Sequence, residues 1–169
     1  MTLRLILGDQ LNYRHSWYKT KDPDILYVLM EMRQETDYAL HHAQKIIGFF
    51  AAMYNFSRYL SKNGHQVLHL KINDAENRQS LPENLNHLIA KHSITHFEYQ
   101  LPDEFRLDQQ LTGFCRKLNI SSKHYDTEHF LTTREELATV FSGKKMFLME
   151  TFYRYMRKKY QILMENDQP

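Results

Sequence analysis

The stretch from Leu3 to Leu11 reads LRLILGDQL, and it decides the fold expected for this chain of 169 residues. Its apolar part, Leu3 to Leu7, is short and begins almost at the N-terminus, as is typical of a buried strand in a parallel sheet. Gly8 ends the run, since glycine lets the backbone turn sharply. Asp9 and Gln10 are then expected just beyond the strand's carboxyl end, where open α/β sheets bind ligands. The alternative is that Asp9 caps a turn and Gln10 is solvated.

The composition is that of an ordinary globular domain. Hydrophobic residues make up 42% of the chain, and five Gly and four Pro argue against disorder. The single cysteine, Cys115, excludes an internal disulfide and an all-cysteine metal site within one chain, so a reducing, cytoplasmic location is expected. No run approaches the roughly 18 apolar residues of a membrane span, and no signal peptide is evident. The net charge of +2 is too small to indicate nucleic-acid binding by itself.

Four further strands are expected after the first. They are short runs rich in apolar or alternating residues over 25–31, 66–72 and 95–101, and a weaker, polar run over 120–125 that is expected at an edge of the sheet. Helical stretches separate them, so the chain alternates β and α up to about residue 126. This alternation predicts an α/β fold, a Rossmann-like doubly wound sheet of five parallel strands in the order 3-2-1-4-5, with helices on both faces.

The expected helices have recognisable boundaries. Apolar residues at 3.6-residue spacing predict a long helix over 37–61. Ser80 with Glu83, and Thr132 with Glu135, have the spacing of capping boxes that open two short helices. Further helices are expected from about residue 107 to 119 and from 145 to 164.

Familiar catalytic and metal motifs are missing from the chain. It contains no GxGxxG, GxxxxGK[ST], GxSxG or HExxH sequence, and its ten histidines are scattered. A structural role is expected for the pair His41 and His42, and Cys115 is expected to be an inert thiol. No catalytic residue and no metal ligand is assigned.

One group of polar residues is expected to meet at a single place in the fold. Asp9 and Gln10 follow the first strand, and Glu31, Glu35 and Tyr38 follow the second. If the two strands are neighbours, all five side chains reach one crevice at the carboxyl edge of the sheet. Acids and an amide suit the N–H and carbonyl edges of a pteridine or flavin-like ring. They do not suit a phosphate, which the acids would repel.

Three segments carry a resemblance to a known family. They are LILGDQLN at 5–12, VLMEMRQETDYALHHAQKIIGFFAAMYNF at 28–56 and FLMETFYRYMRKKYQILMENDQP at 147–169. Their order and spacing resemble the deoxyribodipyrimidine photolyase-related family, the branch of bacterial cryptochromes and (6–4) photolyases that carry an iron–sulfur cluster. The resemblance implies that 1–144 form an N-terminal antenna domain and that 145–169 form a helix and the start of a linker to a catalytic domain. FAD, the 4Fe-4S cluster and the DNA-binding surface would belong to that further domain, so this chain alone is not expected to be catalytic.

The resemblance also implies a light-harvesting chromophore, 6,7-dimethyl-8-ribityllumazine. Asp9, Gln10, Glu35 and Tyr38 match residues that contact it in relatives. Met30 stands where some relatives have cysteine, and Phe49 where some have isoleucine; both would lie against the ring. The complete expected set is Asp9, Gln10, Met30, Glu31, Glu35, Tyr38 and Phe49.

Two other functions stay open beside the antenna domain. The same fold could hold an empty or repurposed pocket and act as a ligand-binding or protein-interaction module, or it could be a free-standing enzyme acting on a nucleotide-like substrate. The last helix carries an apolar stripe, which predicts packing on the sheet domain and a homodimer contact through the remaining aromatic residues: Met149, Phe152, Tyr153, Met156 and Tyr160.

Overall fold

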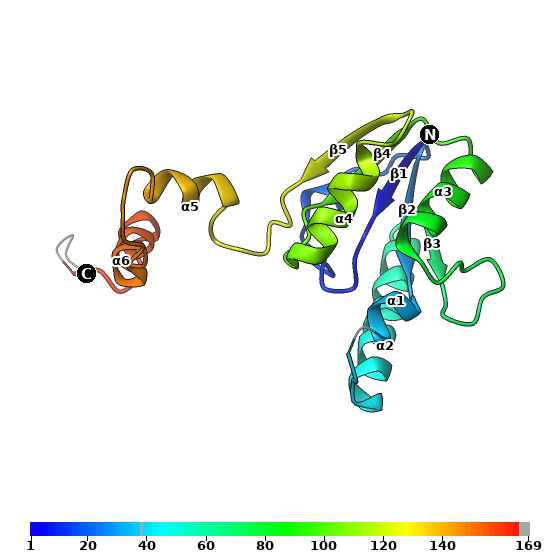
Figure 1. Cartoon of the computed structure of the whole chain (residues 1–169), viewed down its shortest axis with the longest axis horizontal. Coiled ribbons are helices and arrows are strands. Elements are labelled where there is room, and N and C mark those ends of the chain that lie inside the picture. The colour runs from blue at the N-terminus through cyan, green and yellow to red at the C-terminus, as the bar shows by residue number, and fades with distance from the viewer. Residues whose placement is uncertain (38, 166–169) are drawn as a thin grey trace. The chain divides into compact units, whose positions relative to one another are not determined.

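The computed structural model describes residues 1–37 and 39–165. The chain forms two compact units, Met1–His129 and Phe130–Pro169 (Figure 1). The boundary expected between residues 144 and 145 falls inside the second unit, between its two helices. Among the described residues, no helix is both long and apolar enough to cross a membrane.

The first unit is built on one sheet of five parallel strands. They are β1 (Thr2–Leu5), β2 (Ile25–Met30), β3 (Gln66–Leu70), β4 (His96–Gln100) and β5 (Ser121–Tyr125). The strand order is β3-β2-β1-β4-β5, and every pairing is parallel. The predicted fold class, strand order and direction are confirmed. β1, the most apolar run, is central and pairs with both β2 and β4.

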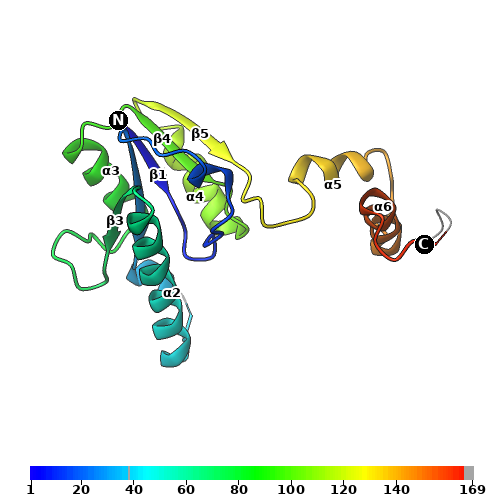
Figure 2. The same ribbon diagram turned by 180° about the vertical axis from the view of Figure 1, so that it is seen from behind.

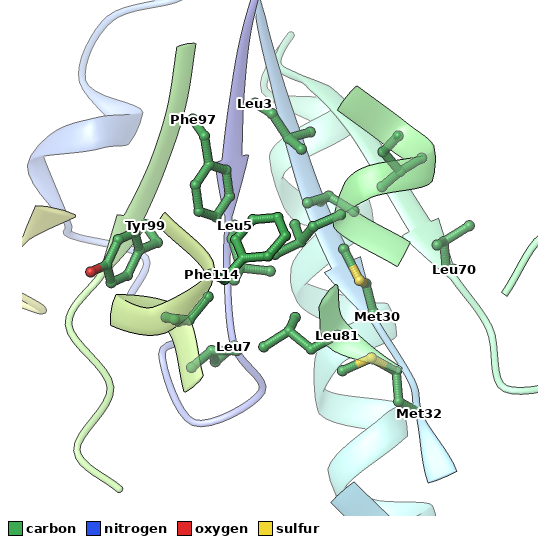
Figure 3. Packing of buried hydrophobic residues seen from close by; sticks show 14 of the residues in the cluster. Leu3, Leu5, Leu7, Met30, Met32, Leu70, Leu81, Phe97, Tyr99 and Phe114 are labelled. Atoms are coloured by element: carbon green, nitrogen blue, oxygen red, sulfur yellow. The ribbon is translucent and has the colours of Figure 1, made fainter. Parts of the chain in front are cut away.

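One face of the sheet packs against α3 (Leu81–Lys91) and α4 (Phe105–Cys115). Because side chains alternate along a strand, β1 sends Leu3 and Leu5 to this face. Figure 3 shows them among Phe97, Phe114 and other side chains of this core.

The other face is covered by α2 (Ala43–Lys62), as Figure 2 shows from behind. This face contributes Ile6, Tyr27 and Leu29 to a second core. They pack with α2 and with Trp17 of the short 3₁₀ turn η1 (Ser16–Tyr18). The two clusters confirm a doubly wound arrangement, with a buried layer on each side of the strands.

The long helix begins later than expected. A short helix, α1 (Arg33–Thr36), follows β2, and α2 starts only at Ala43 rather than near residue 37. The reason is a local cap: the His42 ring accepts a hydrogen bond from the Gln44 amide, which satisfies one of the helix's first N–H groups. The structural role expected at this histidine pair is therefore found at His42.

Both expected capping boxes are wrong in detail. Ser80 is the N-cap residue of α3, but within the described part of the chain its side chain makes no capping hydrogen bond. The Leu81 amide is instead satisfied by Gln34 Oε1, at 3.0 Å. In α5 (Arg134–Val140) the N-cap is Thr133, whose hydroxyl accepts from the Glu136 amide. The N-cap is thus displaced by one residue, from Thr132 to Thr133.

The second unit contains α5 and α6 (Met149–Tyr160), and α6 is shorter than the expected 145–164. Among the described residues of these two helices, none is buried. Polar contacts join the helices: Glu136 accepts hydrogen bonds from Tyr155 and Lys159, and from Thr132 before α5. Packing of α6 on the sheet domain and dimerisation through its aromatic stripe stay predictions.

Candidate functional site

A cavity of about 190 Å³ opens at the carboxyl ends of β1 and β2. Its walls come from the end of β1 and the turn after it, the end of β2, α1, the first half of α2 and the start of α4. Most of the lining is apolar: Leu5, Ile6, Leu7, Met30, Met32, Ile46, Phe49, Phe50, Met53 and Leu107. The remaining residues are Gly8, Asp9, Glu35, Thr36, His41, Lys45 and Glu104. Leu7, Met30 and Met32 are visible near the strand ends in Figure 3.

The structure brings four of the expected site residues to this cavity: Asp9, Met30, Glu35 and Phe49. Tyr38 lies outside the described residues. Gln10 and Glu31 lie near the same edge of the sheet, but they are not part of the cavity lining. The expected crevice therefore exists, with a composition that differs from the predicted one.

Gln10 holds the turn in place. It is only 1% exposed, so the alternative of a solvated side chain is wrong. Its Oε1 accepts from the Leu7 amide at 3.1 Å, and its Nε2 donates to the carbonyls of Gln100 and Leu101. These bonds fasten the turn after β1 to the end of β4, and they occupy the amide's donor and acceptor atoms.

Glu31 is turned toward the segment after β3. Its Oε2 accepts from the Ile72 amide at 3.0 Å, and its Oε1 lies 3.1 Å from Nε2 of His69. Burial lowers the pKa of His69, and the nearby Glu31 carboxylate opposes that shift. Asn77 donates to the Glu31 backbone carbonyl at 2.6 Å. Glu31 thus organises the connection between β3 and α3.

Asp9 is the exposed acid on the rim of the cavity. Partial desolvation of its carboxyl raises its pKa, and the negative charges of Asp103 and Glu104 raise it further. His129, which lies 2.9 Å from Asp103, acts in the opposite direction. A hydrogen-bond donor on a ligand would therefore stabilise the ionised form of the Asp9 carboxyl.

Glu35 is held by an arginine that the sequence analysis did not assign. Arg106 Nη2 lies 3.1 Å from Glu35 Oε2, and Arg106 Nε lies 2.8 Å from Glu104 Oε1. Arg106 therefore bridges α1 and the start of α4 beside the cavity. Its position in the sequence could have indicated this role. Glu104 and Arg106 follow the fourth strand, whose carboxyl end lies at the same edge of the sheet as that of β1.

Two basic residues of the lining were also missed. His41 lies just before the N-cap of α2 and Lys45 lies in the first turn of that helix, with Lys45 Nζ 3.3 Å from His41 Nδ1. Only Lys45 belongs to the helix, so helical i, i+4 spacing could not have indicated this contact.

Phe49 lies against Gly8 at the base of the turn. A methyl group added to Gly8 would come within 2.6 Å of Phe49 Cε1 and 3.0 Å of Met53 Sδ. The backbone of Gly8 is outside the left-handed region, so other residues could adopt its conformation. Glycine is needed here for the close approach of the ring, and not for the sharp turn expected from sequence.

The arrangement suits a flat heteroaromatic ligand. Apolar and thioether side chains can cover the faces of a ring, while carboxylates and a lysine at the rim can meet its polar edge. Among the described residues, no group of three or more His, Cys, Asp or Glu side chains is placed to hold a metal ion. Fold and site together define an open-sheet α/β protein with a ligand cavity at the carboxyl edge.

The family whose description reads deoxyribodipyrimidine photo-lyase-related protein matches residues 4–169, and the chain belongs to this family. It is 32% identical to a (6-4) photolyase of Agrobacterium fabrum over 169 residues, which cover 99% of this chain and 33% of that protein. The chain thus spans about a third of the length of this relative. It is also 24% identical to an uncharacterised protein of Acanthamoeba polyphaga mimivirus, over 90% of this chain and 80% of that protein.

Proposed function

We propose that the first unit is the light-harvesting antenna domain of a photolyase-related protein that serves light-dependent DNA repair or blue-light sensing. The supporting observation is the cavity at the carboxyl ends of β1 and β2, whose lining includes Asp9, Met30, Glu35 and Phe49. Open α/β sheets bind their ligands at this edge. Membership of the photolyase-related family makes a chromophore the ligand to test first.

The residues fit the chemistry of 6,7-dimethyl-8-ribityllumazine. One ring of this molecule carries N–H and carbonyl groups, the other carries two methyl groups, and the ribityl chain carries hydroxyls. Asp9 would accept hydrogen bonds from N–H or hydroxyl donors, and Lys45 would donate to a carbonyl. The methionine and phenylalanine side chains would cover the methylated ring. When bound, this group would supply absorption of light and transfer of the excitation energy to a flavin.

Glu35 would contribute in a different way from Asp9. Its Oε2 is paired with Arg106, and its Oε1 accepts weakly from Gln34 Nε2 at 3.3 Å. A carboxylate oxygen has more than one lone pair, so Glu35 can still accept from a ligand while Arg106 fixes its orientation. Arg106 is therefore a positioning residue for this acid.

The test is titration of lumazine fluorescence against the wild type and the double variant Asp9→Ala, Glu35→Ala. We expect the double variant to bind about 10-fold to 1,000-fold more weakly, because two hydrogen bonds worth roughly 0.7–2 kcal/mol each are lost. The matched control is Asp24→Ala, Glu83→Ala, which removes two exposed acids outside the cavity lining. Equal affinities, or no binding by the wild type at millimolar protein, would contradict the proposal.

One observation favours the second candidate, a repurposed pocket that binds another ligand. The cavity of about 190 Å³ is smaller than the roughly 300–1,000 Å³ of most small-molecule sites. A ligand smaller than a ribityl-substituted ring would then be preferred. Binding of unsubstituted lumazine in preference to the ribityl compound would support this candidate over the antenna function.

A further inference from the structure

We infer that Gly8 and Phe49 act together as a size filter, which admits a two-ring chromophore and excludes a three-ring flavin from the same cavity. The inference rests on the proposed function and specifies its ligand class. Gly8 contributes to selectivity because its lack of a side chain lets the Phe49 ring lie close to the turn.

The first step is the contact itself. Phe49 comes from the first half of α2, and its ring reaches the turn after β1, where Gly8 leaves room for it. Phe49 is 38% exposed, so its ring is a wall between the cavity and solvent rather than part of the core. Met53 lies beside it on the same helix and is only 1% exposed, which leaves the ring little freedom to move inward.

The second step is the volume that this wall leaves. An apolar cavity of about 150 Å³ holds one benzene ring. A cavity of about 190 Å³ therefore encloses little more than one six-membered ring.

The third step is the direction in which a ligand would enter. The lining of the cavity is largely apolar, and its polar residues include Asp9, Lys45 and Glu35, which is paired with Arg106. A pyrimidinedione edge would stay with the polar groups, since buried N–H and carbonyl groups need partners. The rest of the ring system would then point into the apolar part. For lumazine that is one ring, which fits; for riboflavin it is two, for which the cavity has no room while the Phe49 ring forms part of its wall.

The experiment compares two probes that share the same polar edge and the same ribityl chain, 6,7-dimethyl-8-ribityllumazine and riboflavin. The ratio of their dissociation constants is measured by fluorescence titration for the wild type and for Phe49→Ala. We expect the wild type to prefer lumazine and Phe49→Ala to shift the ratio toward riboflavin by about tenfold or more. Tyr59→Ala is the matched control, because Tyr59 lies on the same helix, is similarly exposed at 43% and is outside the lining.

A second pair of variants tests the part played by Gly8. Gly8→Ala should displace the Phe49 ring and lower lumazine affinity about tenfold. In the Phe49→Ala background the same change should alter the affinity less than about twofold, since coupled residues are non-additive. If Gly8→Ala lowers the melting temperature too far for titration, Phe49→Leu with and without Gly8→Ala provides the same comparison with more room for the added methyl group.

The outcomes separate this inference from the proposed function. Lumazine binding with an unchanged probe ratio in Phe49→Ala, or equal effects of Gly8→Ala in both backgrounds, would overturn the filter and leave the antenna function standing. Absence of binding of either probe to both the wild type and Phe49→Ala would overturn both. Riboflavin bound as tightly as lumazine by the wild type would overturn the filter alone.

Discussion

The interactions that stabilise the first unit differ from those that stabilise the second. In the first unit, two layers of buried apolar side chains enclose the sheet. In the second, the described residues of α5 and α6 include none that is buried, and a carboxylate, Glu136, joins the helices through Tyr155 and Lys159. Large exposed hydrophobic residues are also frequent there, among them Phe147 and Met149. The comparison teaches that the site-bearing unit owes its shape to a buried core, whereas the second unit relies on polar contacts and on ring contacts between partly exposed side chains such as Phe141 and Phe152.

The largest expected effect on this comparison is the loss of stability when a large core side chain of the first unit is removed. Phe97 is fully buried between β4 and α4, in contact with Tyr99 and Phe114. Phe97→Ala should lower the free energy of unfolding by about 3–5 kcal/mol, because it loses apolar burial and leaves a cavity. Urea unfolding followed by Trp17 fluorescence would measure it. Phe105→Ala, at an exposed position of α4, is the control and should change little; equal losses would contradict the contrast.

An intermediate effect is expected from acid in the second unit. Hydrogen bonds from Lys159, Tyr155 and Thr132 lower the pKa of Glu136 from its usual 4.5 to about 2. A carboxyl with a lowered pKa in the folded state stabilises that state above pH 4.5, and the contribution is lost as the pH falls from about 4.5 to about 2.

Hydrogen exchange of residues 134–160 over this pH range would detect the loss. In Glu136→Gln, protection should be reduced at neutral pH and should vary less with acid. Glu135→Gln alters the neighbouring exposed acid of the same helix and should retain the wild-type pH dependence. An unchanged acid profile in Glu136→Gln would contradict the role given to this carboxylate.

The smallest effect is expected for self-association of the second unit. Met149 and Tyr153 are 76% and 52% exposed and lie one turn apart on α6. Exposed apolar patches favour contacts between molecules, so sedimentation should become concentration-dependent in the wild type. Met149→Ser with Tyr153→Ser should restore a monomer, whereas Phe105→Ser in the first unit should not. A clean monomer of the wild type at high concentration would contradict the homodimer prediction.

The sheet could be predicted because its signals are local and repeated. Apolar runs such as Leu3–Leu7, separated by helical spacing, are sufficient to indicate parallel strands, and the most apolar run is central. Helix starts were less predictable because neighbouring residues compete for the same cap. Thr133 rather than Thr132 caps α5, and His42 sets the start of α2, by hydrogen bonds that depend on the final backbone path.

The site could be predicted in position but only partly in composition. Sequence places polar residues after the strands, and Asp9 and Glu35 do reach one cavity. Which way each side chain turns depends on partners far along the chain. Gln10 bonds to carbonyls about 90 residues away, and Glu31 to an amide 41 residues away. Arg106 joins the site for the same reason, through an ion pair with a residue 71 positions earlier.

The fastening of Gln10 has a consequence for how such a domain can be redesigned. Because Nε2 of Gln10 donates to carbonyls at the end of β4, the position of Asp9 depends on the pairing of two central strands, β1 and β4. The exposed segment over residues 19–24 could then change in sequence while the binding edge stays in register, whereas His15 and Trp17 of the same loop are buried and belong to the fixed part. Gln10 thus helps to hold the binding edge independently of this exposed segment, so its surface could be altered beside an unchanged cavity.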